Sequence, residues 1–132
     1  MACLVISSSL NPKSRSRLLA LIAFKTLKNI DVSVDWLDLA DHSIPLCDGD
    51  STYKNSKVKE LKEKIQNAKG IVLAVPIYNY DVNAAAKNLI ELTGDAWANK
   101  VVGFLCAAGG KGSYMSVMSL ANSLMLDFRC LI

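Results

Sequence analysis

Hydroxyl and basic side chains are concentrated in one stretch near the N-terminus, residues 7–17, which reads Ser-Ser-Ser-Leu-Asn-Pro-Lys-Ser-Arg-Ser-Arg. It follows a short apolar run that predicts a buried strand, and it precedes a helical pattern that starts near Ser16. A helix N-terminus presents free N–H groups and the positive end of the helix dipole to an anion. The stretch therefore predicts either a cradle for the phosphate of a mononucleotide cofactor or a well-capped helix start with a polar loop.

Two further loops have unusual compositions. Residues 76–81 read Pro-Ile-Tyr-Asn-Tyr-Asp, and residues 107–113 read Ala-Ala-Gly-Gly-Lys-Gly-Ser. Glycines let a backbone approach a flat ligand closely. The second loop is not a Walker A motif, because a glycine separates Lys111 from Ser113, and nucleoside triphosphate hydrolysis is not expected. His42 is interpreted as a surface histidine, because the Gly-x-Ser-x-Gly elbow of a hydrolase is absent from the sequence.

The elements that must position these loops alternate along the chain. Hydrophobic patterns predict strands at 2–7, 32–39, 71–75, 101–106 and 127–132, and helices at 15–29, 56–68, 82–92 and 113–124. Regular alternation of this kind predicts an α/β fold with a parallel sheet and right-handed crossovers. The unbroken apolar runs predict central strands, and the expected strand order is 2-1-3-4-5. In this order, known from flavodoxin, a ligand lies outside the carboxyl ends of strands one and three, where all three loops should meet.

The same patterns predict which residues face the core and where two elements end. Gly70 is expected to cap the helix before it, and Pro76 to stop the third strand. The expected core faces of the four helices are Leu19, Ile22, Ala23 and Leu27; Val58, Leu61 and Ile65; Ala85, Ala86 and Leu89; and Met115, Met118, Ala121 and Met125.

Length and composition limit the function classes. The 132 residues suit one domain, spanning 1–132, and 52% of them are hydrophobic. A net charge of +3 suits an anionic ligand but is too weak to indicate nucleic-acid binding. No membrane span or signal peptide is expected. The cysteines, at 3, 47, 106 and 130, form no CxxC pair, so no metal site is expected; three lie in apolar runs, which favours buried thiols and a reducing, cytoplasmic compartment.

Three motifs, in order and over essentially the whole chain, resemble those of the NAD(P)H-dependent FMN reductases of the flavodoxin-like superfamily. The first is the family's Gly-Ser-Leu-Arg-x-x-Ser-x-Asn, matched by Ser9 and Ser14 within residues 8–16. The second, the most specific, is Pro-x-Tyr-Asn at residues 76–79, followed by Ala-Lys-Asn-Leu-Ile-Glu at 86–91. The third is a Gly-Gly-x-Gly loop at residues 109–112.

The resemblance implies a flavodoxin-like three-layer sandwich that holds FMN and uses NADPH or NADH as co-substrate. It implies electron transfer to a small-molecule acceptor such as flavin, a quinone, an azo compound or a metal oxyanion, in a homodimer or homotetramer, with no catalytic side chain required. The implied phosphate ligands are Ser9, Asn11, Ser14 and Ser16; the residues beside the flavin ring are Pro76, Ile77, Tyr78 and Asn79; and Gly109 and Gly110 lie at its pyrimidine side. Lys87 and Asn88 are expected to be structural.

Several departures from the family pattern leave alternatives open. Asn11 stands where the family has arginine, so Lys13, Arg15 or Arg17 is expected to supply the missing charge. Tyr80 and Asp81 replace the small residues that the family usually has after its Tyr-Asn pair, which bears on ring placement and on the nicotinamide pocket. The family's final helix is missing, which predicts an under-covered sheet face. The alternatives are a flavodoxin-type electron carrier without NAD(P)H activity, which the positive charge disfavours, and a flavin-free relative of the fold.

Overall fold

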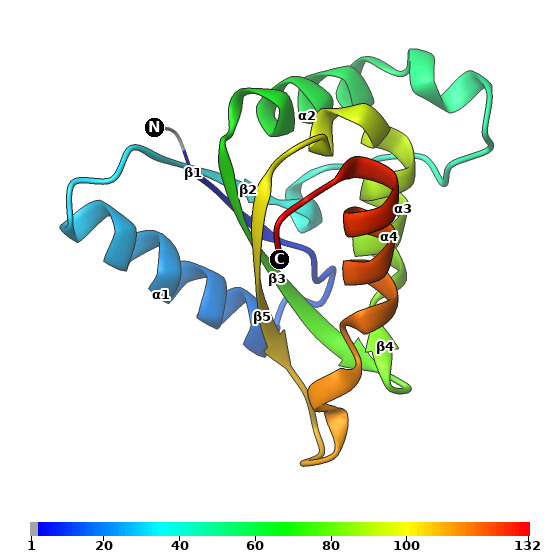
Figure 1. Cartoon of the computed structure of the whole chain (residues 1–132). Helices are drawn as coiled ribbons and strands as arrows, with labels where there is room; N and C mark the ends of the chain where they lie inside the picture. Colours follow the sequence, from blue (N-terminus) through cyan, green and yellow to red (C-terminus); the bar gives the residue numbers. More distant parts are fainter. Residues whose placement is uncertain (1–2) are drawn as a thin grey trace.

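The computed structural model describes residues 3–132 and has a parallel sheet with helices on both faces (Figure 1). The strands follow the order β2-β1-β3-β5, and the two-residue β4 pairs antiparallel with the end of β3. The strands are β1 (Cys3–Ser7), β2 (Val34–Asp38), β3 (Gly70–Tyr78), β4 (Asp81–Val82) and β5 (Val101–Ala107). The helices are α1 (Arg15–Asn29), α2 (Ser56–Asn67), α3 (Ala84–Thr93) and α4 (Met118–Phe128). The α/β class and the order of the first four predicted strands are confirmed.

Both faces of the central strand β3 are buried, as its unbroken apolar run predicts. Leu73 and Val75 face the larger core, which α2, α3 and α4 cover, and Ala74 faces the smaller core beneath α1. Figure 1 shows α1 on one face of the sheet and the other three helices on the opposite face. Among residues 3–132, no helix has the length and apolarity needed to cross a bilayer.

The prediction of a fifth strand over residues 127–132 is wrong in extent. α4 continues to Phe128 and ends at Arg129, whose φ of 56° is left-handed and whose N–H donates to the Met125 carbonyl over 3.1 Å. The few residues that remain make one parallel bridge, from Leu131 to Val101. Beyond this bridge, residues 103–107 have no further strand partner on that side within the described chain.

One face of the sheet is under-covered near β5, as expected. Val101 is 56% exposed and Gly103 is exposed on the α1 side of the sheet, where the described residues supply α1 alone. No helix follows α4 within residues 3–132.

Two predicted element ends are wrong. Pro76 lies inside β3 rather than at its end. Proline is tolerated there because β1 has already ended, so no acceptor on β1 needs the N–H that proline lacks. Gly70 begins β3, whereas α2 ends at Asn67 and the Ala68 N–H donates to the Ile65 carbonyl.

The helix faces agree with the sequence pattern only in part. The predicted core faces of α2 and α3 are confirmed, except that Ala85 is only half-buried. In α1, Ile22 is 62% exposed, because the face that meets the sheet contains Ser16 and Ala20 instead. Of the core face predicted for the fourth helix, Ala121 is buried as expected, but Met115, which precedes α4, and Met118 and Met125 are exposed. Leu120 and Leu124 are buried in their place. A short 3₁₀ turn delays the start of α4 and changes the face that it presents.

The long connection between β2 and α2 is organised by two polar side chains. Asn88 of α3 donates to the Pro45 carbonyl over 3.0 Å and accepts from the Cys47 N–H over 2.8 Å. Asp48 accepts from the hydroxyls of Ser51 and Thr52 over 2.6 and 2.7 Å, and these bonds lower the pKa of the Asp48 carboxyl far below its usual range. The structural role expected for Asn88 is confirmed.

The expectation of buried thiols is wrong for two of the three cysteines in strand-like runs. Cys130 is buried, but Cys106 is exposed and Cys3 is only half-buried. Both lie near solvent because the described residues cover the sheet incompletely around the start of β1 and along β5.

Candidate functional site

A cavity of about 270 Å³ opens at the carboxyl ends of β1, β3 and β5, where the three unusual loops meet. Two cations, Lys13 and Arg15, contribute to its lining, as do Ala107 at the end of β5 and Ala108 just after it. Eight of the residues expected at the site also line it: Ser9, Asn11, Ser14, Ser16, Pro76, Ile77, Tyr78 and Gly109. The fold thus brings together residues from distant parts of the chain at the predicted crevice.

Two of the expected residues, Asn79 and Gly110, lie outside this lining. Asn79 and Tyr80 form the turn between β3 and β4, with φ of 53° and 62°, as in a type I′ hairpin. Asparagine tolerates this left-handed conformation well, whereas tyrosine adopts it less readily. Gly110 follows Gly109 in the exposed loop after β5.

The start of α1 provides hydrogen-bond donors to the cavity. Ser14 is the N-cap, and its hydroxyl accepts from the Arg17 N–H over 3.1 Å and lies 2.9 Å from the Ser16 hydroxyl. The N–H groups of Arg15 and Ser16, in the first helical turn, have no acceptor among the described residues. The helix start is thus capped by Ser14 and still leaves two backbone N–H groups available to a ligand.

The loop before α1 is held in place by its own hydrogen bonds. The Asn11 side chain accepts from the Lys13 N–H over 2.9 Å, and the Asn11 carbonyl accepts from the Ser14 N–H over 3.1 Å. At the end of β1, the Ser8 hydroxyl lies 2.8 Å from Asn83 Oδ1, and Asn83 Nδ2 donates to the Ser8 carbonyl over 2.8 Å. The loop is thus tied to the start of α3, so ordering of this loop would add little to the entropic cost of binding a ligand.

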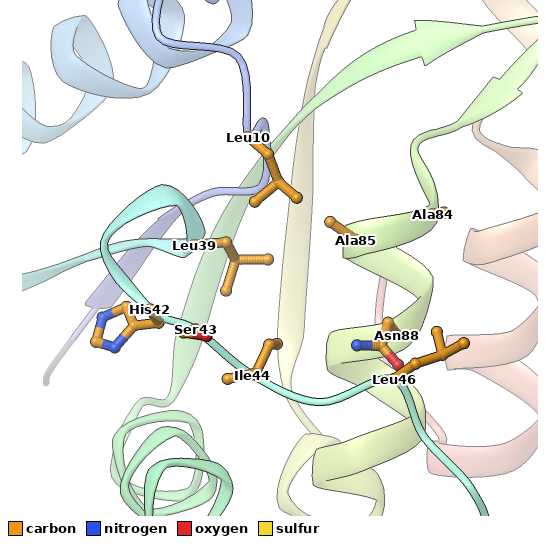
Figure 2. A pocket seen from close by; sticks show the side chains of 9 residues that line it. All are labelled: Leu10, Leu39, His42, Ser43, Ile44, Leu46, Ala84, Ala85 and Asn88. Carbon is orange, nitrogen blue, oxygen red and sulfur yellow. The ribbon is translucent and has the colours of Figure 1, made fainter.

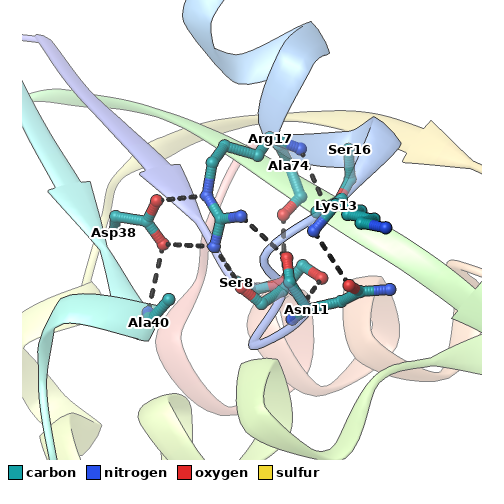
Figure 3. Close-up of polar contacts among 10 residues, drawn as sticks. Ser8, Asn11, Lys13, Ser16, Arg17, Asp38, Ala40 and Ala74 are labelled. Carbon is teal, nitrogen blue, oxygen red and sulfur yellow. Dashed lines mark hydrogen bonds and ion pairs between the residues drawn. The ribbon is translucent and has the colours of Figure 1, made fainter.

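The cations of this region have different roles. Lys13 and Arg15 are exposed and line the cavity, where the described lining contains no carboxylate. Arg17 does not line it; its guanidinium pairs with Asp38, and the hydrogen bond to Asp38 raises the pKa of Arg17 (Figure 3). The expectation that Arg17 could supply charge to the cradle is therefore wrong, and Lys13 and Arg15 are the cations available to it.

A larger cavity of about 420 Å³ lies on the other side of the loop that follows β1 (Figure 2). The sequence patterns did not predict this cavity. Leu10 reaches it from the loop after β1, and the rest of the lining comes from the connection after β2 and from α3. The sequence offers only a weak signal for it, the apolar side chains of Ile44 and Leu46 within an otherwise polar connection. Most of its side chains are apolar, and its polar Asn88 is already engaged by backbone groups. The smaller cavity is therefore the better match for an anionic ligand.

Comparison with known proteins identifies the family. The sequence model of the NADPH-dependent FMN reductase family matches residues 1–131. The chain belongs to this family. It is 29% identical over 105 residues to an NAD(P)H-dependent FAD/FMN reductase of Geobacillus thermodenitrificans (strain NG80-2), a match that covers 77% of this chain and 56% of the relative. It is 34% identical over 90 residues to an NADPH azoreductase of Bacillus sp. (strain OY1-2), covering 66% of this chain and 51% of the relative. The chain thus spans about half the length of the curated relatives that it matches.

Solved structures share the fold of this family member. An apo NADH:FMN oxidoreductase superposes with a TM-score of 0.83 at 23% identity, over 99% of this chain and 72% of that one. FerB, an NAD(P)H:acceptor oxidoreductase from Paracoccus denitrificans, superposes with a TM-score of 0.77 at 20% identity, over 94% of this chain and 70% of that one. At these identities the likeness establishes the flavodoxin-like fold alone.

Proposed function

We propose that this chain binds FMN in the cavity between the loops after β1, β3 and β5, and passes electrons from NADPH or NADH to a small-molecule acceptor. The observation that carries the proposal is the convergence of three family motifs on one cavity. Its support is threefold: membership of the family, hydroxyl and N–H donors beside two cations, and a lining without carboxylates.

The residues present fit the two ends of FMN. In this proposal the phosphate lies at the start of α1, against the Ser9 and Ser14 hydroxyls, the free N–H groups of the first turn and the exposed cations. The flavin ring lies against residues 76–78 of β3 and residues 107–109 at the end of β5 and in the loop that follows. Pro76 is buried and rigid, and the small residues after β5 leave room for a planar ring.

When bound, FMN supplies the redox chemistry, because it can take a hydride from a nicotinamide and release electrons to a second acceptor. The chain holds and orients the flavin. Among the described lining residues there is no histidine or carboxylate. Tyr78, which is 53% exposed, would stand at the rim, where it can stack on an incoming substrate.

Anaerobic reduction tests this function. The purified protein is saturated with FMN, excess flavin is removed, and NADPH or NADH is added in the absence of oxygen while flavin absorbance is recorded. Prompt bleaching is the expected result. Retained FMN that neither nucleotide reduces would favour the electron carrier, and failure to retain FMN would overturn both functions.

The acceptor, the domain organisation, the assembly and the compartment complete the proposal. The acceptor is a free flavin, a quinone or an azo compound, which steady-state assays with each class would rank; the azoreductase relative supports the last. The chain forms one domain over residues 1–132 and assembles as a homodimer or homotetramer, supported by exposed apolar side chains along α4, including Leu126. It works in a reducing compartment such as the cytoplasm, because its four cysteines are free thiols. Light scattering tests the assembly.

A further inference from the structure

Arg17 lies beside the proposed phosphate cradle, yet nearly all of its hydrogen-bonding capacity is used within the protein (Figure 3). Its Nε and Nη2 atoms donate to the two carboxylate oxygens of Asp38, the second over 3.2 Å. Its Nη2 also donates to the Ser9 carbonyl over 2.9 Å, and its Nη1 donates to the Asn11 carbonyl over 2.7 Å. A guanidinium has five N–H groups, so at most one remains for a ligand.

Asp38 completes this arrangement from the neighbouring strand. It ends β2, and its Oδ1 also accepts from the Ala40 N–H over 3.1 Å, which fixes the carboxylate from both sides. The side chains of Arg17 and Asp38 are only 17% and 7% exposed. A fork-to-fork pair with this little exposure has a defined geometry, and removing one partner leaves the other without compensation.

The two carbonyls that Arg17 holds belong to the cradle itself. Ser9 and Asn11 line the cavity, whereas Arg17 and Asp38 do not. A carbonyl oxygen that turned toward a phosphate would repel it. Because the guanidinium binds both oxygens, it neutralises them and fixes two peptide planes of the loop, since each peptide unit is rigid and planar.

We propose that Arg17 is a positioning residue: with Asp38, it holds the loop of residues 9–14 in the shape that receives the phosphate of FMN, without itself binding that phosphate. The inference rests on the proposed function. It distinguishes this cation from Lys13 and Arg15, which line the cavity themselves.

The test compares the affinities of FMN and riboflavin, which has the same ring but no phosphate, by quenching of flavin fluorescence. Arg17→Met is expected to weaken FMN binding about tenfold or more, the scale of a lost charge-assisted interaction, and to change riboflavin binding by less than about twofold. Lys25→Met removes one exposed cation from the same helix, and so produces the same change in net charge. It is expected to leave both affinities unchanged.

Asp38→Asn separates positioning from direct contact by the sign of its effect. If Arg17 bound the phosphate, loss of the Asp38 charge would release the guanidinium and strengthen FMN binding. Positioning predicts weaker FMN binding in Asp38→Asn, and a loss in the Arg17→Met/Asp38→Asn double variant close to that of either single variant. Arg17→Lys keeps the positive charge but lacks the forked guanidinium, so it should also weaken FMN binding. This variant replaces Arg17→Met in the test if the methionine variant does not fold.

The possible results separate failure of the positioning role from failure of the proposed function. Tighter FMN binding in Asp38→Asn, equal losses for FMN and riboflavin, or unchanged FMN affinity in both Arg17 variants would overturn the positioning role while leaving FMN binding by the wild type intact. A wild-type protein that binds no FMN would overturn the proposed function, and this inference with it.

Discussion

Replacing Ser14 by aspartate tests the phosphate cradle with little disturbance of the fold. Aspartate is as good an N-cap as serine, so α1 should keep its start and the free energy of unfolding should change little. The new carboxylate, however, would face the bound phosphate. Two unit charges 4 Å apart repel by about 1 kcal/mol in water and by about 4 kcal/mol at an effective dielectric constant of 20.

The size of the effect follows from the charge of the phosphate. A phosphate monoester carries nearly two negative charges at neutral pH, so the repulsion lies between about 2 and about 8 kcal/mol. Even the lower figure raises the Kd for FMN about 30-fold. The loss should shrink as ionic strength rises, because the cradle is open to solvent and salt screens exposed charges.

Fluorescence titration with FMN measures this Kd, and Ser14→Asn is the matched control, because asparagine caps equally well without the charge. The asparagine variant should bind FMN far more tightly than the aspartate variant, and riboflavin should bind the two alike. Equal FMN affinities in the two variants would refute the placement of the phosphate at the start of α1.

Three further predictions concern stability. Leu61→Ala, at a side chain 1% exposed in the larger core, should lower the free energy of unfolding by about 2–5 kcal/mol in urea denaturation, whereas Leu18→Ala, at a site 60% exposed on α1, should leave it within about 0.5 kcal/mol. Arg129→Gly should raise it by about 1 kcal/mol, because glycine adopts the left-handed φ of 56° without strain; a lower unfolding midpoint would contradict this. Hydrogen bonds depress the folded-state pKa of Asp48, so its contribution to the free energy of unfolding is present above a pH of about 4 and is lost as the pH falls further. Asp48→Asn should therefore flatten the pH dependence of the free energy of unfolding in acid. Parallel curves for the variant and the wild type would disprove this prediction.

The parallel sheet and the meeting of the three loops could be predicted from the sequence, because both follow from hydrophobic patterns that do not depend on tertiary contacts. The unbroken apolar run of β3 correctly predicts a central strand, which is buried on both faces. The same prediction is wrong for β5, which lies at the edge of the described sheet and exposes Val101, Gly103 and Cys106. The convergence of the loops then follows from strand order alone.

Side-chain partners and helix phase could not be predicted in the same way. Arg17 looked like a free cation of the cradle, because nothing in the local sequence shows that Asp38, on another strand, would bind it. The face of α4 was misplaced because leucine and methionine occur on most of its sides, so the start of the helix decides which ones are buried. Pro76 was taken to end β3, yet it is accommodated because β1 ends before reaching it.

The open side of β5 has a consequence for how the sheet can be extended. Residues 101–107, Val-Val-Gly-Phe-Leu-Cys-Ala, contain no charge and no proline, which are the usual means by which edge strands avoid pairing with one another. Among residues 3–132, Leu131 pairs with the beginning of this strand, and residues 103–107 have no strand partner on that side. The sheet edge formed by β5 therefore has backbone groups that a further strand can pair with, and no side chain of β5 opposes such an addition by its charge.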